Sequence, residues 1–232
     1  MRLSKLLGLM SRLRRRPWLL TFRLLLERIP FKPLDINCLY FIEYKGIPPD
    51  NMQFSRSRAE IRSATLEDLE GLTKCENTPR EFMNRFRSND YCVVAVRDSR
   101  IVGYGWATDK PSCIEERYSY RIDVSPDAIY LYDCFILPEY RVVHMIWLRF
   151  ISIYMGQLMR RLGKKRMIGM IDYGNRISMN THLRFGFKLT HKVFVIRVFG
   201  KSFFLKRPAR GDKVDLPSWI SVLGKTRTWP AS

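Results

Sequence analysis

The chain has 232 residues, of which 46% are hydrophobic, enough for one domain with a full core and an extension. Lys and Arg number 41 against 22 Asp and Glu, and the resulting net charge of +19 indicates an anionic partner such as nucleic acid, anionic lipid or a phosphorylated substrate. The 5 cysteines are odd in number and show no Cys-x-x-Cys spacing, which argues against a disulfide framework and a metal site and fits a reducing cytoplasm.

The first 33 residues combine many cations with regularly spaced apolar side chains. They carry nine Lys or Arg and a single acid, Glu27. Leucines and a methionine fall at helical spacing from Leu3 to Leu13, and a second apolar group from Trp18 to Leu26 follows Pro17. This pattern predicts a basic amphipathic helix with a kink, which is the composition of an interfacial membrane anchor.

We therefore expect residues 1–33 to bind an anionic membrane surface and to be dispensable for the fold of the rest. The alternative is a helix packed on its own domain or on a second copy of the chain, as in a homodimer. Charges every few residues exclude a transmembrane span. A secretory signal is not indicated, since no uninterrupted apolar stretch precedes a cleavage site.

The domain boundary is expected soon after this segment. An apolar run from Cys38 to Ile42 could add a strand, and a turn follows from Gly46 to Asp50. We assign residues 1–52 to a basic N-terminal extension, residues 53–207 to the main domain and residues 208–232 to a basic tail.

The first half of the main domain alternates strands and helices. From Ala59 the pattern predicts a strand, two helices, the second over residues 78–86, and two strands over residues 91–96 and 101–107. Alternating apolar residues on either side of the polar turn Arg97–Arg100 indicate a hairpin. The polar stretch that follows is typical of a solvated loop.

Residues 128–187 are the most informative part of the sequence. An aromatic and β-branched run from Ala128 to Leu137 ends at Pro138 and predicts a buried strand. Three further elements are expected: a helix over residues 142–162, a strand over residues 166–172 and an Asn-led helix over residues 175–185. A strand that runs directly into a helix aims unpaired N–H groups and the positive end of the helix dipole at one spot, which favours an anion. A closing hairpin about Gly200 is expected after Phe187.

Three ordered motifs resemble the GNAT N-acetyltransferase superfamily. The segment Ile136–Arg141, followed by a helix, is similar to the family's acyl-CoA pyrophosphate-binding segment, and residues 61–72 resemble its opening strand and helix. Five residues have the spacing of a later family segment: Asn175, Ser178, His182, Gly186 and Phe187. The resemblance covers about residues 59–207 and implies an α/β fold of the GNAT type, a central mixed, mostly antiparallel sheet flanked by helices, here with an N-terminal helical extension.

The resemblance implies that acetyl-CoA or another acyl-CoA is the acyl donor. The residues that would hold it are Phe135, Ile136, Leu137 and Asn175 at the pantetheine arm and thioester, and Arg141, Val142, Val143, His144, Met145 and Ile146 at the pyrophosphate. The family has small residues after the arginine, and His144 and Ile146 stand there in this chain. These side chains narrow or reshape the phosphate cradle, while the main-chain N–H donors survive the change.

Acyl transfer to an amine needs a base for the amine's proton and an acid for the departing thiolate. His182 stands where the family often has the tyrosine that protonates the sulfur, and imidazole can donate such a proton. The alternative for His182 is a packing residue. For the base, Asp133 is the most conspicuous candidate, because burying a carboxylate in an apolar strand is costly unless it is paired or functional. A structural hydrogen bond to a loop or to the extension is the alternative for Asp133, and Glu115 and Glu116 are weaker candidates for the base.

The leading hypothesis is a cytoplasmic GNAT-type acyltransferase at the inner face of a membrane. It would move an acetyl or other acyl group from a CoA thioester to an amine-bearing acceptor. The alternative is a non-catalytic GNAT-like module that binds an anionic partner or membrane through its basic surface. A nucleic-acid-binding protein is supported by charge alone, since no helix-turn-helix, zinc-finger or RNA-recognition signature is visible.

Overall fold

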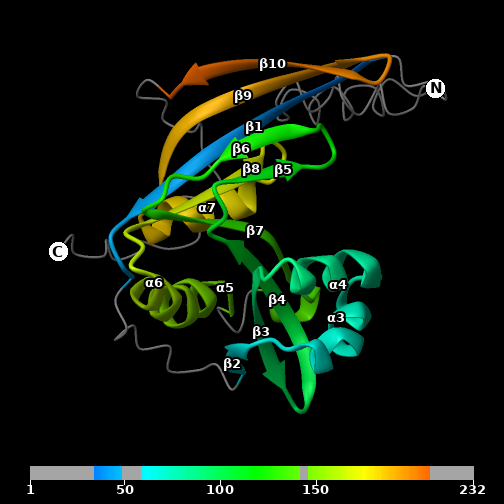
Figure 1. The fold of residues 1–232 in the computed structure, drawn as a ribbon, viewed down its shortest axis with the longest axis vertical. Coiled ribbons are helices and arrows are strands. Elements are labelled where there is room, and N and C mark those ends of the chain that lie inside the picture. The colour runs from blue at the N-terminus through cyan, green and yellow to red at the C-terminus, as the bar shows by residue number, and fades with distance from the viewer. Residues whose placement is uncertain (1–33, 49–58, 142–145, 210–232) are drawn as a thin grey trace, which may run out of the picture.

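The computed structural model describes residues 34–48, 59–141 and 146–209. Eight strands form the main sheet: β1 (Leu34–Lys45), β2 (Glu60–Ser63), β3 (Tyr91–Arg97), β4 (Arg100–Thr108), β7 (Ala128–Ile136), β8 (Arg166–Asp172), β9 (Lys188–Val198) and β10 (Lys201–Pro208). Their order is β10-β9-β1-β8-β7-β4-β3-β2, and β5 (Ser112–Glu115) pairs with β6 (Tyr120–Asp123) in a separate two-stranded sheet (Figure 1). Only the β7–β8 pair of the described strands is parallel, so the predicted mixed, mostly antiparallel sheet is confirmed.

The helices follow the predicted order. They are η1 (Leu66–Asp68), α3 (Leu69–Cys75), α4 (Pro79–Arg87), η2 (Pro138–Tyr140), α5 (Ile146–Arg149), η3 (Phe150–Met155), α6 (Gly156–Leu162) and α7 (Arg176–Phe185). The segments α5, η3 and α6 follow one another without a break, and η3 has π-helical hydrogen bonding, which the apolar spacing did not predict. Gly163 ends α6 in a left-handed conformation, which glycine adopts readily at the end of a helix. No helix in the described ranges is long and apolar enough to cross a membrane.

The position of β1 corrects the predicted domain boundary. On sequence alone residues 1–52 form an extension, but β1 lies inside the sheet, between β8 and β9. Its side chains alternate between the two faces of the sheet, and Leu39 and Ile42 are both fully buried, so the strand is held by packing on both sides. The predicted helix within residues 1–33 and the tail beyond Ala209 lie outside the described residues.

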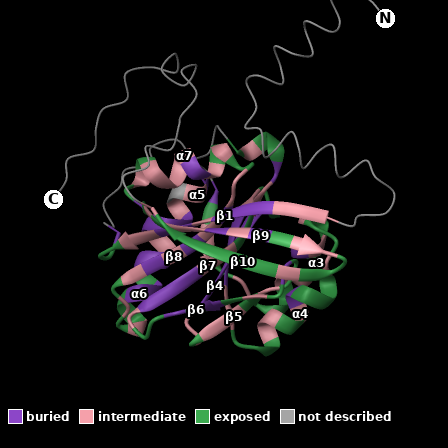
Figure 2. Cartoon of the chain, turned by 90° about the horizontal axis from the view of Figure 1, so that it is seen from above, coloured by how far each residue is buried: buried purple, intermediate pink, exposed green. Residues whose placement is uncertain are grey.

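Both faces of the central strands of the sheet are covered. On one face, α5, η3, α6 and α7 pack their apolar side chains, such as Phe150 and Met159, on the strands. On the other face, the β5–β6 hairpin and the turn that joins its strands cover β1 and β9, and α3 and α4 cover β3 and β4 around Trp106. The strands in the middle of the sheet are accordingly the most buried part of the chain (Figure 2).

Candidate active site

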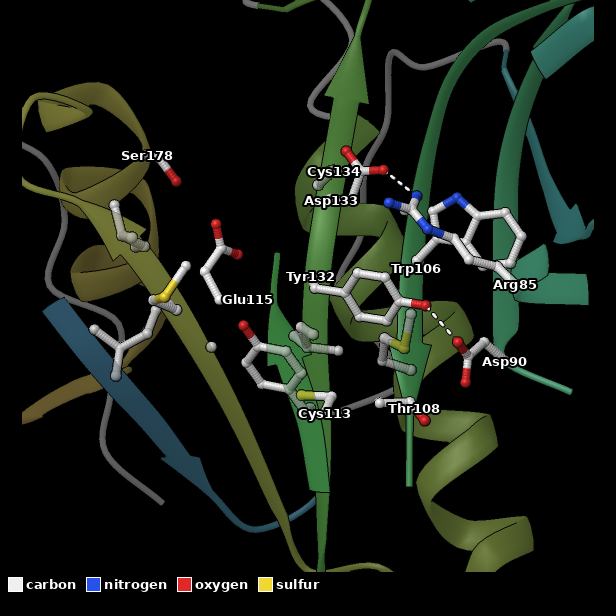
Figure 3. A pocket seen from close by; sticks show the side chains of 18 of the residues that line it. Arg85, Asp90, Trp106, Thr108, Cys113, Glu115, Tyr132, Asp133, Cys134 and Ser178 are labelled. Atoms are coloured by element: carbon white, nitrogen blue, oxygen red, sulfur yellow. Dashed lines mark hydrogen bonds and ion pairs between the residues drawn. The ribbon is translucent and has the colours of Figure 1, made fainter. Parts of the chain in front are cut away.

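The candidate site is a cleft that opens where two neighbouring strands separate. The parallel register of β7 and β8 runs from Ala128 opposite Arg166 to Leu131 opposite Gly169, while β7 continues to Ile136 and β8 to Asp172. A cavity of about 820 Å³ opens there, with side chains from both strands in its lining (Figure 3). The apolar side of the cavity comes from η3, through Phe150, Ile151 and Met155. π-Helical turns of this kind occur often at functional sites.

A β-bulge shapes the β7 wall of the cleft. Trp106 lies opposite Tyr132, and Tyr104 opposite Phe135, so Gly105 of β4 faces two residues of β7, Asp133 and Cys134. Asp133 has φ of 45° in the left-handed region, which few residues other than Gly, Asn and Asp adopt readily. A bulge leaves one residue out of the hydrogen-bond ladder and turns the strand, so this part of β7 presents backbone polar groups that the sheet does not use.

Asp133 is not buried as the apolar strand predicted. Its side chain is 31% exposed and forms an ion pair with Arg85 of α4 (Figure 3). The carboxylate therefore has a partner on a helix, rather than on a loop or on the N-terminal extension. The Arg85 guanidinium also lies over the rings of Trp106 and Tyr132, at 5.4 and 5.2 Å from their centres. Burial opposes the charge on Arg85, but Asp133 outweighs it and the pKa of the guanidinium is raised.

A second polar group lies beside this ion pair. The Tyr132 hydroxyl donates to Asp90 Oδ2 at 2.7 Å, and the Lys110 ammonium is 2.8 Å from Asp90 Oδ1. Burial first, and then the hydrogen bond to Asp90, raise the pKa of Tyr132, which keeps the phenol protonated. Arg85, Asp90 and Tyr132 were not predicted from the sequence, because no local motif marks residues that meet only in the folded sheet.

Glu115 faces the cleft from the end of β5. Its carboxyl points into the space between β7 and β8 in Figure 3. Burial raises its pKa, and Arg117, whose Nε is 3.7 Å from Glu115 Oε1, opposes the rise. Arg117 is itself held by Asp172 at 2.7 Å, and Asp172 also accepts a hydrogen bond from Asn37 at 2.7 Å. Glu115 is thus a carboxylate in a site that disfavours its charge, which is the property expected of a general base near neutral pH.

Helix α7 brings the predicted Asn175, at its N-cap, and His182, in its last turn, to the lining of the cleft. Asn175 Oδ1 accepts from the Ser178 N–H at 3.1 Å, so this residue caps the helix. His182 Nδ1 lies 2.7 Å from the Ser178 carbonyl oxygen, which requires the proton on Nδ1, and the ring packs edge-on against Trp147. Burial lowers the pKa of His182 to about 4, so the imidazole is neutral at pH 7.

The predicted cofactor segment is partly engaged within the protein. Arg141 Nε donates to the Ile136 carbonyl at 2.8 Å, and its guanidinium lies 5.7 Å from the centre of the Phe135 ring. The Leu137 N–H donates to Val102 O at 3.0 Å and so belongs to the sheet. Ile146 is fully buried, whereas Val142, Val143, His144 and Met145 lie outside the described residues.

No protein-family model and no curated protein sequence matches the chain. Among solved structures, it is similar to a functionally unknown conserved protein from Staphylococcus epidermidis, with 13% identity, a TM-score of 0.51, and coverage of 75% of this chain and 66% of the other. It is also similar to a tandem GNAT protein from the clavulanic acid biosynthesis pathway, with 12% identity, a TM-score of 0.51, and coverage of 71% and 54%. An aminoglycoside N-acetyltransferase in complex with CoA matches at 20% identity and a TM-score of 0.45, over 56% of this chain and 91% of that one.

The chain thus spans about two thirds of the first structure and about half of the second. The sheet order, the separated β7 and β8, and the likeness to the tandem protein show that this chain has the fold of the GNAT acetyltransferases. At these identities the likeness concerns the fold, and the chemistry has to be argued from the cleft itself.

Proposed function

We propose that this protein is an acyltransferase that moves an acetyl or other acyl group from a CoA thioester to an amine. The observation that carries the proposal is the separation of β7 and β8 beyond Leu131 and Gly169, beside the bulge at Asp133. An extended pantetheine arm carries amide groups, and a strand edge offers matching N–H and C=O groups in the way that a sheet accepts an added strand. The apolar surface of η3 then packs along the arm.

In the proposed reaction the amine nitrogen attacks the thioester carbonyl carbon, the C–S bond breaks, and the nitrogen loses a proton. We assign that proton to Glu115, because burial raises the pKa of its carboxyl and its side chain faces the cleft. The earlier candidate, Asp133, is less suited to the role, since its carboxylate is engaged in an ion pair with Arg85. In this assignment Asp133 fixes Arg85 at the mouth of the acceptor side.

The departing thiolate takes up a proton, and His182 is the donor that the resemblance predicts. Its low pKa and the hydrogen bond from Nδ1 to Ser178 O support the packing alternative over the acid role. His182→Ala separates the two. An acid role predicts a kcat lower by about a hundredfold with unchanged acyl-CoA affinity. A packing role predicts lower stability and an unchanged kcat per folded molecule.

The charge of the cleft supports an amine acceptor that carries positive charge. Six acidic side chains line it: Glu81, Asp90, Glu115, Glu116, Asp133 and Asp172. Three basic side chains accompany them: Arg85, Lys110 and Arg117. The cleft therefore has an acidic excess in a chain whose net charge is +19, which favours a cationic amine over an anionic one.

Titration calorimetry with acetyl-CoA and longer acyl-CoA thioesters tests the proposal. We expect binding to the wild-type chain and its loss in Cys134→Phe, because Cys134 lines the cleft and a phenyl ring would occupy the path of the arm. Leu66→Phe is the matched control, because Leu66 is 56% exposed and does not line the cleft. No binding of any acyl-CoA at millimolar concentration would refute the proposed acyltransferase activity. The alternative would then be a non-catalytic module, which the net charge of +19 supports.

A further inference from the structure

The β9–β10 hairpin exposes large apolar side chains on one face of the main sheet. Phe203 and Leu205 of β10 are 59% and 50% exposed, and Ile196 of β9 is 41% exposed. Phe203 lies opposite Ile196, and Leu205 opposite Phe194, so these four side chains form one continuous surface. Figure 2 shows β10 exposed along nearly its whole length.

The same surface continues onto β1. Ile36 pairs with Ile196 and Leu34 with Val198, on the side of β9 away from β10. We call the surface formed by these side chains of β1, β9 and β10 the outer face. It is distinct from the opposite face of the same strands, where Val193 and Val195 are fully buried under the β5–β6 hairpin.

The rim of the outer face is basic. Strands β9 and β10 contain six Lys or Arg and no Asp or Glu: Lys188, Lys192, Arg197, Lys201, Lys206 and Arg207. Alternation along the strands places Lys192, Lys201 and Arg207 on the outer face, beside the apolar side chains. Apolar side chains and cations are therefore presented together, in one direction.

Four occupants of this face can be compared by charge. Two copies of the chain packed face to face would bring like charges together, as would residues 1–33, which carry nine Lys or Arg and one acid. A nucleic acid would neutralise the cations but would leave the aliphatic Ile196 and Leu205 without apolar contacts. An anionic bilayer takes up both, since its headgroups attract cations and its interface buries apolar side chains.

We propose that the outer face docks on an anionic lipid surface. Leu34, where the described chain begins, pairs with Val198 beside the hairpin turn, so the predicted anchor in residues 1–33 is connected to the end of β1 that borders this face. Anchor and sheet then engage one bilayer, and two weak attachments on one chain bind more tightly than either alone. This docking does not depend on the acyltransferase activity.

Vesicle co-sedimentation of the full-length chain tests the proposal, with phosphatidylcholine alone and with phosphatidylglycerol added. Phe203→Ser/Leu205→Ser is expected to lower the partition coefficient on the anionic vesicles by about tenfold or more. The matched control, Leu66→Ser/Ile177→Ser, replaces two side chains that are 56% and 80% exposed elsewhere and should partition as wild type does.

A second pair of variants tests the charge. Loss of each cation should weaken binding to anionic vesicles by about fivefold, and Lys201→Glu/Arg207→Glu should weaken it further, because the new carboxylates are repelled by the headgroups. Raising the salt concentration should reduce the difference between this variant and the wild type. Arg80→Glu/Arg87→Glu changes the net charge equally on the exposed side of α4 and should have the smaller effect.

Four results would overturn the proposal. The first is equal partitioning of the Phe203/Leu205 variant and its control. The second is a lower unfolding temperature of that variant without lipid, which would show that the face is covered within the chain. The third is a wild-type dimer in analytical ultracentrifugation that the variant abolishes, and the fourth is a loss of RNA or DNA binding with lipid binding intact.

Discussion

The bulge at Asp133 can be tested through the order in which replacements destabilise the protein. Asp133 combines a left-handed backbone, with φ of 45°, and an ion pair with Arg85. Asp133→Gly removes the ion pair and suits the backbone, whereas Asp133→Ala removes the ion pair and adds a Cβ in an unfavourable conformation. In an ordinary strand the order is reversed, since Gly is less stable than Ala by about 0.5–1 kcal/mol.

The expected magnitudes come from exposure and backbone conformation. The side chains of Arg85 and Asp133 are 20% and 31% exposed, so the pair lies between a surface pair, worth about 0–1 kcal/mol, and a buried pair, whose disruption costs about 3–5 kcal/mol. We expect Asp133→Gly to lower the free energy of unfolding by about 1–3 kcal/mol. Asp133→Ala should lower it by about 1 kcal/mol more, because left-handed backbone costs about 1–2 kcal/mol in a residue with a Cβ.

Urea unfolding of the two variants measures this difference. Arg121 on β6 is the matched control, because it is exposed, lies in a strand and is ion-paired with Asp123 at 2.9 Å, and its backbone is not among those with positive φ. There the glycine variant should be the less stable of the two. If Asp133→Ala proves as stable as Asp133→Gly or more so, β7 does not have this bulge, and the argument for free backbone groups at the cleft fails.

Three further measurements probe the cleft. Glu115→Gln should lower kcat about a hundredfold or more and remove the fall in rate at acidic pH, because a base with a raised pKa is lost. A larger loss of kcat in Asp133→Asn than in Glu115→Gln would show that Asp133 is the general base instead. Burial lowers the pKa of His182 to about 4, so its contribution to stability is present above about pH 6.5, the unfolded value, and is lost as the pH falls toward 4. Between pH 7 and pH 5 the wild-type free energy of unfolding should therefore fall by about 2 kcal/mol more than that of His182→Gln, and equal falls would mean that the ring is hydrated. Gly103→Ala should lower the free energy of unfolding by about 1–3 kcal/mol and weaken acyl-CoA binding, because the new Cβ would lie 3.0 Å from the Phe135 carbonyl oxygen. Gly105→Ala is the control and should be less destabilising, because no atom lies closer than 3.5 Å to its Cβ. Equal destabilisation by the two variants would contradict the close approach of β4 and β7.

The sequence by itself determined the local elements and their order. The aromatic run from Ala128, the apolar spacing before Gly163 and the Asn175 cap each depend on residues close together in the chain, so periodicity and capping rules were enough to place β7, α6 and α7. The resemblance to the GNAT superfamily came from motifs of the same local kind. It gave the right fold because ordered motifs fix the succession of strands and helices.

Only the tertiary structure decided which strands are neighbours and which side chains meet. The place of β1 between β8 and β9 depends on hydrogen bonds to strands more than a hundred residues away, and the alternation of its side chains looks the same at an edge or in the centre of a sheet. The ion pair between Asp133 and Arg85 could not be predicted from the sequence for the same reason. Arg85 lies 48 residues earlier in the chain, and the two meet only because α4 packs on the face of β4 where the bulge turns Asp133 outward. A carboxylate in an apolar strand looks buried when the strand is assumed to be regular, and one extra residue in β7 was enough to expose it.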